Sequence, residues 1–475
     1  MVRWGPQCAR PGITRNASRR HYEPRTKEIS NMSSQVNQGI SGTSAGVAGV
    51  TAAVLGQMAH AQGSDRIRVG MLGCGGRGNG AIRNCLEADP AVEIIALADL
   101  FENQVKGTRD RLVKNEAIKN RIKINDDHLY WGFDCHEKIA RCEADLLLMA
   151  TAPAFRGPQL MAAVKAGKHI FTEKPIATDV AGCREVIAAS NLAKEKGLAI
   201  VAGTQRRHQA GYVETMQRIH DGAIGELVGG QCYWYGGGIW FKGLPRDQKM
   251  SEMEWQCHNW YHFTWLSGDQ ICEQHIHNID VMNWCFNGPP AKFTAVGGRQ
   301  WRSTNQDQVR TAKEVCRAFN NGSEENWEKY NGDIWDHIFA EFEYPNGARC
   351  LSFSGHSPGS GRNGEKIVGT KGTSDCHRTI TGENAWTFPG GGIDPMVQEH
   401  KDLIASIRSG RPLNEGVQVA ESTLTAIGTR IAAYTGRTFT WKWLLGASKQ
   451  ELVPKEVKPG PGLFHPIATG RDELV

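Results

Sequence analysis

Apolar runs alternate with helical patterns from residue 65 onward. Four short runs of mainly apolar, strand-forming residues occupy positions 67–72, 92–98, 145–149 and 169–171. Ile82 and Leu86 mark a helical pattern after the first run, and residues 159–166 form another before the fourth. Strands that alternate with helices in this way predict an α/β fold with a parallel, doubly wound sheet.

A glycine-rich segment separates the first apolar run from the helical pattern that follows it. Gly73, Gly75 and Gly78 have the G-x-G-x-x-G spacing, with Gly76 and Arg77 between them. Gly73 permits a tight turn, Gly75 lets a pyrophosphate approach the helix N-terminus, and Gly78 permits close packing of the helix on the strand. This order of strand, glycine motif, helix and strand predicts a dinucleotide-binding domain.

An acidic residue ends the second apolar run. Asp99 lies 21 residues past Gly78, where a carboxylate can accept hydrogen bonds from a ribose diol. The same carboxylate repels a 2′-phosphate, and no arginine occurs within residues 100–106. We therefore expect NAD as the cofactor in preference to NADP.

A lysine follows the fourth apolar run, in the sequence Thr-Glu-Lys-Pro at residues 172–175. A residue before proline is disfavoured in helical conformation, so Lys174 is expected to stay at the carboxyl end of a parallel strand. Ligands bind along that edge in doubly wound sheets. Lys174 is therefore a candidate site residue; the alternative is a surface lysine before a turn.

Residues 271–286 predict a single helix that ends at a Gly-Pro-Pro sequence. Glu273, His277 and Asp280 follow at spacings of four and three, which places them on one polar stripe. An acid one turn before a histidine can orient the imidazole and support its protonated form. The alternative role for His277 is that of a hydrogen-bonded structural histidine. We expect no metal site, because His275 and His277 at i and i+2 point apart.

Composition narrows the possible function classes. The chain is 22% charged and 40% apolar, which is typical of a folded globular protein. Its net charge of +5 resides entirely in residues 1–64, and the remaining residues balance. We therefore expect neither a nucleic-acid partner nor an acidic membrane surface as a partner. The longest apolar run, at 45–56, is too short to span a bilayer.

Residues 1–64 have the features of a leader rather than of a domain. Arg19 and Arg20 resemble a twin-arginine export motif, and Ala59-His60-Ala61 is a small-x-small cleavage pattern after a weakly apolar stretch. We expect export to the periplasm through the twin-arginine route. The alternative is a disordered extension on a cytoplasmic protein.

Several motifs together resemble the Gfo/Idh/MocA family of oxidoreductases. They comprise the glycine motif at 73–78, Ala-Thr-Ala-Pro at 150–153, the segment 166–175, and residues 203–208, 277–280, 412–416 and 433–436. The resemblance covers about residues 65–445. It implies a second, α+β domain built on a large, open, mostly antiparallel sheet. It also implies NAD or NADP as the hydride carrier, a sugar or polyol as the substrate, and a homodimer or homotetramer formed through the open sheet face.

The resemblance also implies roles for particular residues. The catalytic candidates are Lys174, His277 and Glu273; His277 matches the family's histidine, whereas Glu273 replaces an aspartate. Cofactor contacts are implied for the following residues: Gly73, Gly75, Gly76, Arg77, Gly78, Asp99, Thr151, Pro153, Glu173 and Lys174. Substrate contacts are implied for the following: Lys174, Arg206, Arg207, Asp280 and His277. For Arg206 and Arg207, a surface ion pair is the alternative.

These observations predict an oxidoreductase that acts on a secondary alcohol or ketone of a sugar, glycoside or polyol. His277 is the expected general base, and Lys174 is expected to stabilise the developing negative charge on oxygen. The alternatives are a redox-assisted lyase, hydrolase or isomerase with tightly bound NAD, and a non-catalytic nucleotide-binding protein. The predicted division is a leader (1–64), a dinucleotide-binding domain (65–175), a substrate and oligomerisation domain (176–450) and a tail (451–475).

Overall fold

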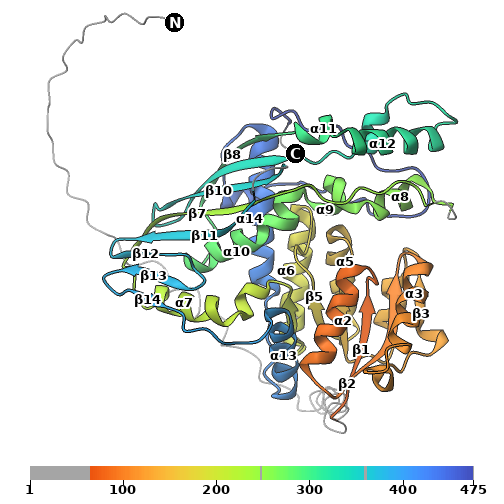
Figure 1. Cartoon of the computed structure of the whole chain (residues 1–475), viewed down its shortest axis with the longest axis horizontal. Coiled ribbons are helices and arrows are strands. Elements are labelled where there is room, and N and C mark those ends of the chain that lie inside the picture. Colours follow the sequence, from red (N-terminus) through yellow and green to blue (C-terminus); the bar gives the residue numbers. More distant parts are fainter. Residues whose placement is uncertain (1–64, 246–248, 358–360, 474–475) are drawn as a thin grey trace, which may run out of the picture. The chain divides into compact units, whose positions relative to one another are not determined.

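The computed structural model describes residues 65–245, 249–357 and 361–473 (Figure 1). The predicted leader at 1–64 lies outside these residues. Within them, no helix combines the length and the apolar character that are needed to cross a bilayer.

The first domain is built on a parallel sheet, as the alternating pattern predicts. Six strands of the described chain pair in the order β3-β2-β1-β4-β5-β6, which is the order of a dinucleotide-binding fold. Their bounds are β1 (Ile67–Leu72), β2 (Val92–Asp99), β3 (Leu129–Trp131), β4 (Leu146–Met149), β5 (His169–Thr172) and β6 (Ile200–Ala202). The central strands are almost wholly buried because helices cover both faces of the sheet.

The helices of this domain connect the strands in sequence. They are α2 (Gly76–Ala88), α3 (Glu102–Val113), α4 (Cys135–Ala140), α5 (Arg156–Lys165) and α6 (Val180–Glu195), with short 3-10 turns η1 (Lys119–Arg121), η2 (Asp126–His128) and η3 (Pro153–Phe155). The sheet therefore does not end at residue 175. Strand β6 pairs in parallel with β5, so the first domain reaches past the predicted boundary by one further helix and strand.

The second domain contains the large open sheet that the resemblance implied. Nine strands of the described chain pair in the order β14-β13-β12-β11-β7-β10-β9-β8-β15. The pairing is antiparallel except between β7 and β10. The bounds are β7 (Leu227–Gly236), β8 (Lys292–Gly298), β9 (His337–Glu343), β10 (Arg349–His356), β11 (Arg362–Gly369), β12 (Gly372–Ser374), β13 (Thr379–Gly382), β14 (Trp386–Thr387) and β15 (Phe439–Thr440).

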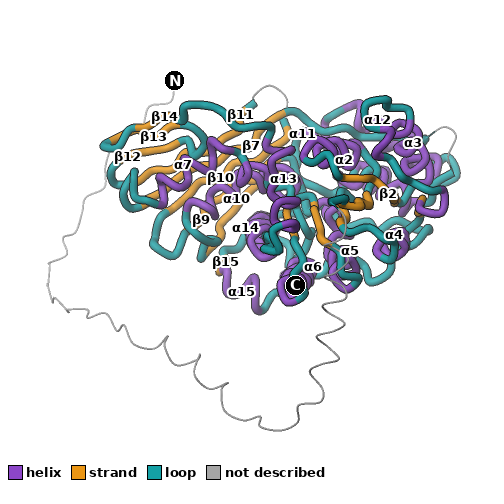
Figure 2. The backbone as a smooth tube through the Cα atoms, turned by 90° about the horizontal axis from the view of Figure 1, so that it is seen from below, coloured by secondary structure: helices purple, strands orange, loops and turns teal. Residues whose placement is uncertain are grey.

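Helices cover one face of this sheet, and the largest apolar core lies beneath α10 (Ile276–Cys285) and α14 (Gly416–Thr435) (Figure 2). The remaining segments are η4 (Gln205–His208), α7 (Ala210–His220), α8 (Glu252–His258), η5 (Trp260–His262), α9 (Thr264–Ser267), α11 (Trp301–Thr304), α12 (Gln306–Phe319), η7 (Trp327–Asn331), α13 (Pro395–Arg408) and α15 (Trp441–Gly446).

The two domains are interlaced through the C-terminal part of the chain. Helix α13 lies beside α2 in both views, and Leu403 and Ile404 are part of the core beneath α2 (Figures 1 and 2). Val419 and Ala420 at the start of α14 join the core on the other face of the same sheet. Residues of α13 and of the start of α14, which lie late in the chain, thus complete the core of the nucleotide-binding domain.

The predicted helix over 271–286 is present, but its beginning is wider than an α-helix. Residues Ile271–His275 form a π turn (η6) that continues into α10. A π turn takes one more residue per hydrogen-bonded ring than an α turn does. Glu273 therefore does not lie on the same side of the helix as His277 in the way that an α-helical spacing of four residues would place it.

Candidate active site

The glycine motif has the geometry that a pyrophosphate requires. Gly73 has a φ of +98°, and a Cβ there would lie 2.7 Å from the carbonyl carbon of Ala150. A Cβ on Gly78 would lie 1.8 Å from the Gly73 carbonyl oxygen. At Gly75 and Gly76, by contrast, no described atom lies within 4 Å of the added carbon. No described side chain caps the N-terminus of α2, so its first N–H groups are available to an anion. These residues fit a dinucleotide.

Asp99 braces the glycine motif at the end of β2. Its Oδ2 accepts a hydrogen bond from the Cys74 amide at 2.7 Å, and its Oδ1 accepts one from the Phe101 amide at 2.9 Å. Burial raises the pKa of Asp99, and these backbone donors oppose that shift. A carboxylate has about four lone-pair sites, so acceptor capacity remains for a ribose hydroxyl group.

Lys174 meets Glu273 of the second domain in a buried ion pair. Lys174 follows the end of β5, and its Nζ lies 3.2 Å from Glu273 Oε1 and 2.5 Å from the Glu273 carbonyl oxygen. Burial raises the pKa of Glu273, and the charge of Lys174 opposes this shift. Lys174 is thus held at the carboxyl edge of the sheet and is not a free surface lysine.

His277 is buried and neutral. Burial lowers its pKa well below the usual value, and the positive charges of Lys174 and Arg206 add to this effect. Its ring stacks on Trp234 of β7 at a centroid distance of 5.6 Å, and its Nδ1 has no partner among the described atoms. A neutral imidazole next to a lysine can accept a proton from a hydroxyl group.

The relation expected between Glu273 and His277 is not the one observed. Glu273 bonds to Lys174, and the pKa of His277 is lowered rather than raised. The π turn separates the two side chains, which an α-helical spacing of four would have brought together. Glu273 therefore acts on the lysine and not on the histidine.

His275, two residues before His277, also contacts the sheet of the second domain. Its Nε2 lies 2.7 Å from Ser352 Oγ in the sheet of the second domain. The described residues contain no group of three or more histidine, cysteine, aspartate or glutamate side chains arranged to hold a metal ion.

The two arginines of η4 occupy different environments. Arg206 pairs with the buried Glu365, whose carboxylate also accepts a hydrogen bond from Asn278 at 2.5 Å. Because Asn278 is next to His277 and the charge of Arg206 lowers the pKa of that histidine, Arg206 belongs to the site.

Arg207 and Asp280 form a buried ion pair of their own. Asp280 is 1% exposed; Arg207 donates to both its carboxylate oxygens at 2.8 and 3.0 Å, and Ser422 of α14 donates at 2.7 Å. The two side chains contact each other in this structure, and the contacts expected between them and a substrate stay a prediction. The pair fixes α10 against η4 and α14.

Arg77 and Glu173, both expected at the cofactor, form an ion pair with each other. Arg77 also lies 3.2 Å from the buried Glu399 of α13. A Cβ on Gly203 would lie 2.5 Å from Glu173 Oε2, so glycine leaves the space that this carboxylate occupies. The network therefore joins the glycine motif, the Glu-Lys-Pro turn and the C-terminal part of the chain.

Arg156 is a site residue that the sequence patterns did not indicate. It is buried, and it donates to the carbonyl oxygens of Thr151 at 2.5 Å, of Glu173 at 2.9 Å and of Pro175. Burial lowers the pKa of Arg156 to about 10. Arg156 therefore links the segment after β4, which contains Thr151, to the Glu-Lys-Pro turn that carries Lys174. Pro153 starts the 3-10 turn between Thr151 and Arg156.

Comparison with family models covers both domains. Residues 67–204 match the family described as "Oxidoreductase family, NAD-binding Rossmann fold". Residues 212–375 match the "GFO/IDH/MocA C-terminal domain".

The similar proteins include polyol dehydrogenases. The scyllo-inositol 2-dehydrogenase (NAD(+)) of Bacillus subtilis is 25% identical over 49% of this chain and 57% of its own length. Inositol 2-dehydrogenase 3 of Saccharopolyspora erythraea is 28% identical over 46% of this chain and 53% of its length. The chain thus matches a little over half the length of these relatives.

Solved structures share the fold at lower identity. An aldose-aldose oxidoreductase from Caulobacter crescentus has a TM-score of 0.59 at 18% identity, covering 79% of this chain and 99% of its own. The scyllo-inositol dehydrogenase from Lactobacillus casei with bound NAD(H) and scyllo-inositol has a TM-score of 0.56 at 15% identity, with coverages of 79% and 99%.

Proposed function

We propose that this chain, which belongs to the Gfo/Idh/MocA family of oxidoreductases, is an NAD-dependent enzyme that oxidises a secondary alcohol of a sugar, glycoside or polyol or reduces the corresponding ketone. The observation that carries the proposal is the buried pair of Lys174 and Glu273 beside a neutral His277, at the carboxyl edge of the parallel sheet. The similarity to inositol dehydrogenases supports the substrate class.

The chain's own residues provide the places for the cofactor. The N–H groups of the glycine motif and of α2 would bind the pyrophosphate, and Asp99 would bind the ribose diol. The bound nicotinamide supplies the acceptor for the hydride that leaves the carbinol carbon. Asp99 favours NAD over NADP because a carboxylate repels a 2′-phosphate.

His277 and Lys174 divide the proton chemistry between them. The neutral imidazole of His277 takes the proton of the substrate hydroxyl group, while the Lys174 ammonium donates a hydrogen bond to the same oxygen. Glu273 holds the ammonium in place through its carboxylate and its carbonyl oxygen. Arg206, held by Glu365, provides a further positive charge and hydrogen-bond donor near His277.

A substrate screen with NAD tests this function. Inositols, monosaccharides and glycosides are incubated with the protein and NAD, and the absorbance band of the reduced nicotinamide is followed. The expected result is reduction of NAD by a subset of polyols or sugars, at a rate that falls about 10²–10⁴-fold in Lys174→Ala. Product formation without accumulation of NADH would identify a redox-assisted lyase, hydrolase or isomerase. Bound nucleotide without any hydrogen exchange would identify a non-catalytic nucleotide-binding protein.

The open face of the second sheet is the proposed subunit interface. Val296 of β8 is 65% exposed, and its neighbours Phe339 of β9 and Leu351 of β10 are exposed to a lesser degree. A contiguous apolar sheet face of this kind is characteristic of protein interfaces. Light scattering on the purified protein should give the mass of a dimer or tetramer, and Val296→Asp should lower it.

Residues 1–64 are proposed as a twin-arginine leader. Support comes from Arg19 and Arg20 and from the Ala-His-Ala sequence at 59–61. Export would place the mature protein in the periplasm, beginning at Gln62. N-terminal sequencing of the exported fraction, with Arg19→Lys/Arg20→Lys as the control, tests the proposal.

A further inference from the structure

A fully buried arginine lies between two histidines in the second domain. One terminal nitrogen of Arg302 in α11 lies 3.0 Å from His262 Nδ1, and the other lies 3.0 Å from His356 Nδ1. Asp336 balances the charge, since its Oδ1 lies 3.4 Å from Arg302 Nε and accepts a hydrogen bond from the Arg302 amide. None of these four side chains has a part in the proton chemistry proposed above.

The arginine fixes which ring nitrogen of each histidine carries the hydrogen. A guanidinium group only donates hydrogen bonds, so both Nδ1 atoms are acceptors and the ring hydrogen of each histidine is on Nε2. His262 therefore donates from Nε2 to the carbonyl oxygen of Trp240, at 2.7 Å. His356 donates from Nε2 to the hydroxyl oxygen of Tyr261, at 3.3 Å. Burial and the charge of Arg302 lower the pKa of His356 to about 3, so its ring is neutral.

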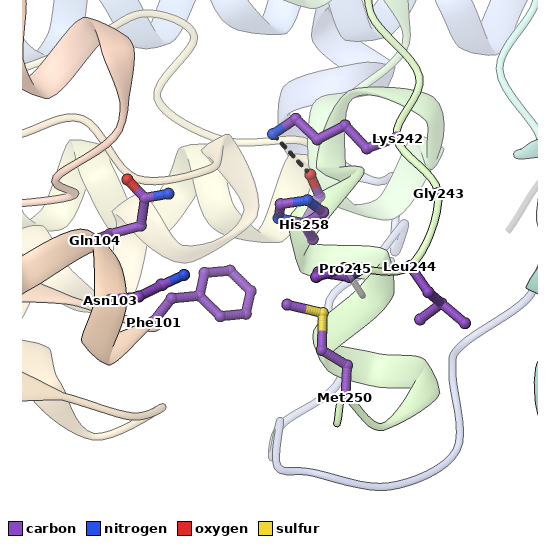
Figure 3. Close-up of a pocket in the computed structure, with 9 residues that line it drawn as sticks. All are labelled: Phe101, Asn103, Gln104, Lys242, Gly243, Leu244, Pro245, Met250 and His258. Atoms are coloured by element: carbon purple, nitrogen blue, oxygen red, sulfur yellow. Dashed lines mark hydrogen bonds between the residues drawn. The ribbon is translucent and has the colours of Figure 1, made fainter. Parts of the chain in front are cut away.

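The first branch of this network holds the loop that follows β7. His262 bonds to Trp240 in this loop, and the amide of Lys242 donates to Asn259 Oδ1 at 2.8 Å. Lys242 Nζ also donates to the carbonyl oxygen of His258 at 3.5 Å, beside a pocket of about 300 Å³ (Figure 3). The loop is thus tied to α8 and η5, which is a structural role.

The second branch reaches the π turn that carries Glu273. Tyr261 is 1% exposed, and its ring stacks on that of His356 at a centroid distance of 5.6 Å. Burial and the charge of Glu273 raise the pKa of Tyr261 well above its usual value, and a hydrogen bond with the side chain of Gln274 opposes this shift. A hydrogen bond lowers the pKa of a phenol when the phenol oxygen accepts it, so the Gln274 amide nitrogen is the donor.

Gln274 is the residue of this turn that solvent reaches. Residues 271–273 and 275–283 are buried, whereas Gln274 is partly exposed. It directly follows Glu273, whose carboxylate and carbonyl oxygen hold Lys174. Because its amide nitrogen donates to Tyr261, its carbonyl oxygen is the atom left to accept a hydrogen bond from a bound molecule.

We propose that the carbonyl oxygen of Gln274 accepts a hydrogen bond from the substrate hydroxyl group next to the one that is oxidised. Arg302, His356 and Tyr261 are the positioning residues that turn this oxygen toward the substrate. The adjacent hydroxyl is the one concerned, because the residue before Gln274 holds the lysine that contacts the reacting oxygen. This inference rests on the proposed oxidoreductase function and narrows the substrate class to compounds with a free vicinal diol.

Steady-state kinetics test the inference. The wild type, Tyr261→Phe and Gln274→Met are compared with the compound that reduces NAD fastest in the screen of inositols, monosaccharides and glycosides. Each variant should raise KM about three- to tenfold, the size of one hydrogen bond. The kcat should be unchanged, because the bond is present both before and during hydride transfer. The dissociation constant of NADH should stay at the wild-type value.

Tyr344→Phe is the matched control. Tyr344 is also 1% exposed, and its hydroxyl donates to Asn283 at 3.1 Å, near the end of α10 that is opposite to the π turn. This variant loses a buried tyrosine hydroxyl, as Tyr261→Phe does, but should keep the wild-type KM. Arg302 itself is left in place, because its removal would leave Asp336 as an unpaired buried charge.

A double variant shows whether Tyr261 acts through Gln274. If it does, Tyr261→Phe has no further effect once Gln274 is replaced, so the double variant should have the KM of Gln274→Met alone. The deoxy derivative of the substrate, which lacks the adjacent hydroxyl group, should have the same KM with the wild type and with Gln274→Met.

The possible results separate this inference from the proposed function. A wild-type KM in either single variant, a fall in kcat in place of a rise in KM, or multiplied effects in the double variant would overturn the inference and leave the proposed function standing. A wild type that reduces NAD with no compound of the screen would overturn the proposed function, and the inference with it.

Discussion

Lys174 and Glu273 stand 99 residues apart in the chain and belong to different domains, yet the Nζ of one lies 3.2 Å from Oε1 of the other in a buried pair. The pair links the end of a parallel strand to the π turn that precedes α10. The position of the lysine therefore depends on the contact between the domains, and loss of either partner leaves an uncompensated buried charge.

Removing this pair should affect the chemical step. We expect Lys174→Ala to lower kcat about 10²–10⁴-fold, because the developing alkoxide loses its donor. Glu273→Gln should also lower kcat, though less, because its carbonyl oxygen still holds the ammonium. Steady-state kinetics combined with NADH titration provide the measurement. Near-normal turnover in both variants would assign the pair a structural role alone.

His277 should determine the acidic limb of the pH profile. Its lowered pKa keeps the base form present as the pH falls through 6.5, so kcat/KM should stay level there and decline only at lower pH. His277→Ala should lower kcat about 10²–10⁴-fold and remove this limb. His220→Ala, which changes an exposed histidine, is the matched control. A wild-type limb centred at or above pH 6.5 would contradict the assignment.

Asp99 should control the choice between the two cofactors. We expect the wild type to bind NADH more tightly than NADPH. Asp99→Ala should narrow this difference in affinity by about ten- to a hundredfold, since one charged contact is worth about 1.5–3 kcal/mol. Because the Asp99 carboxylate also braces Cys74 and Phe101, Asp99→Asn tests the charge with less disturbance. Tighter binding of NADPH by the wild type would refute the preference.

Gly203→Ala should weaken nucleotide binding without altering a charged group. The added methyl group would lie 2.5 Å from Glu173 Oε2 and displace the carboxylate that pairs with Arg77. We expect a loss of about tenfold in NADH affinity and about 1–3 kcal/mol in stability. Gly446→Ala, where no described atom lies within 4 Å of the new carbon, is the control. Equal affinities of the two variants would exclude this role for the Arg77–Glu173 pair.

His208 should make stability depend on pH in the alkaline range. Burial alone would lower its pKa, but hydrogen bonds to Asp402 and Glu415 raise it to about 10. The folded state therefore holds a proton that the unfolded state releases above about pH 6.5. The resulting stability is fully present below pH 6.5 and is lost as the pH rises toward 10.

Thermal melts of the wild type and His208→Gln measure this contribution. The variant should be less stable by about 1.5–3 kcal/mol near pH 6, the usual value of hydrogen bonds to charged groups. The two melting temperatures should converge as the pH rises from 6.5 to 10. A difference that stays constant over this range would show that the histidine is not charged in the folded protein.

The features of the fold that depend on residues close together in the chain could be predicted from the sequence. The order of β1, α2 and β2, the role of Gly73 and Gly78, and the place of Lys174 after β5 all depend on neighbours within a few tens of residues. Periodicity also located the helix that carries His277. It did not reveal the π turn, because that turn depends on packing and leaves no mark in the spacing of apolar residues.

Long-range contacts explain what the sequence did not reveal. The partner of Arg207 lies 73 residues away in Asp280, and Arg77 pairs with Glu399 across 322 residues. No periodicity connects such positions, so the pairing of Arg207 with Asp280 could not be distinguished from contacts with a substrate.

Because α13 packs on the first domain, the nucleotide-binding domain cannot be separated from the rest of the chain by a single cut. A fragment that ends after β6 would lack Leu403 and Ile404 from its core and Glu399 beside Arg77. It would expose apolar surface and would be expected to aggregate rather than to bind nucleotide. A chimera that exchanges the nucleotide-binding domain for that of a relative must therefore take residues from two separate stretches of the chain, the second of which includes α13 and the start of α14.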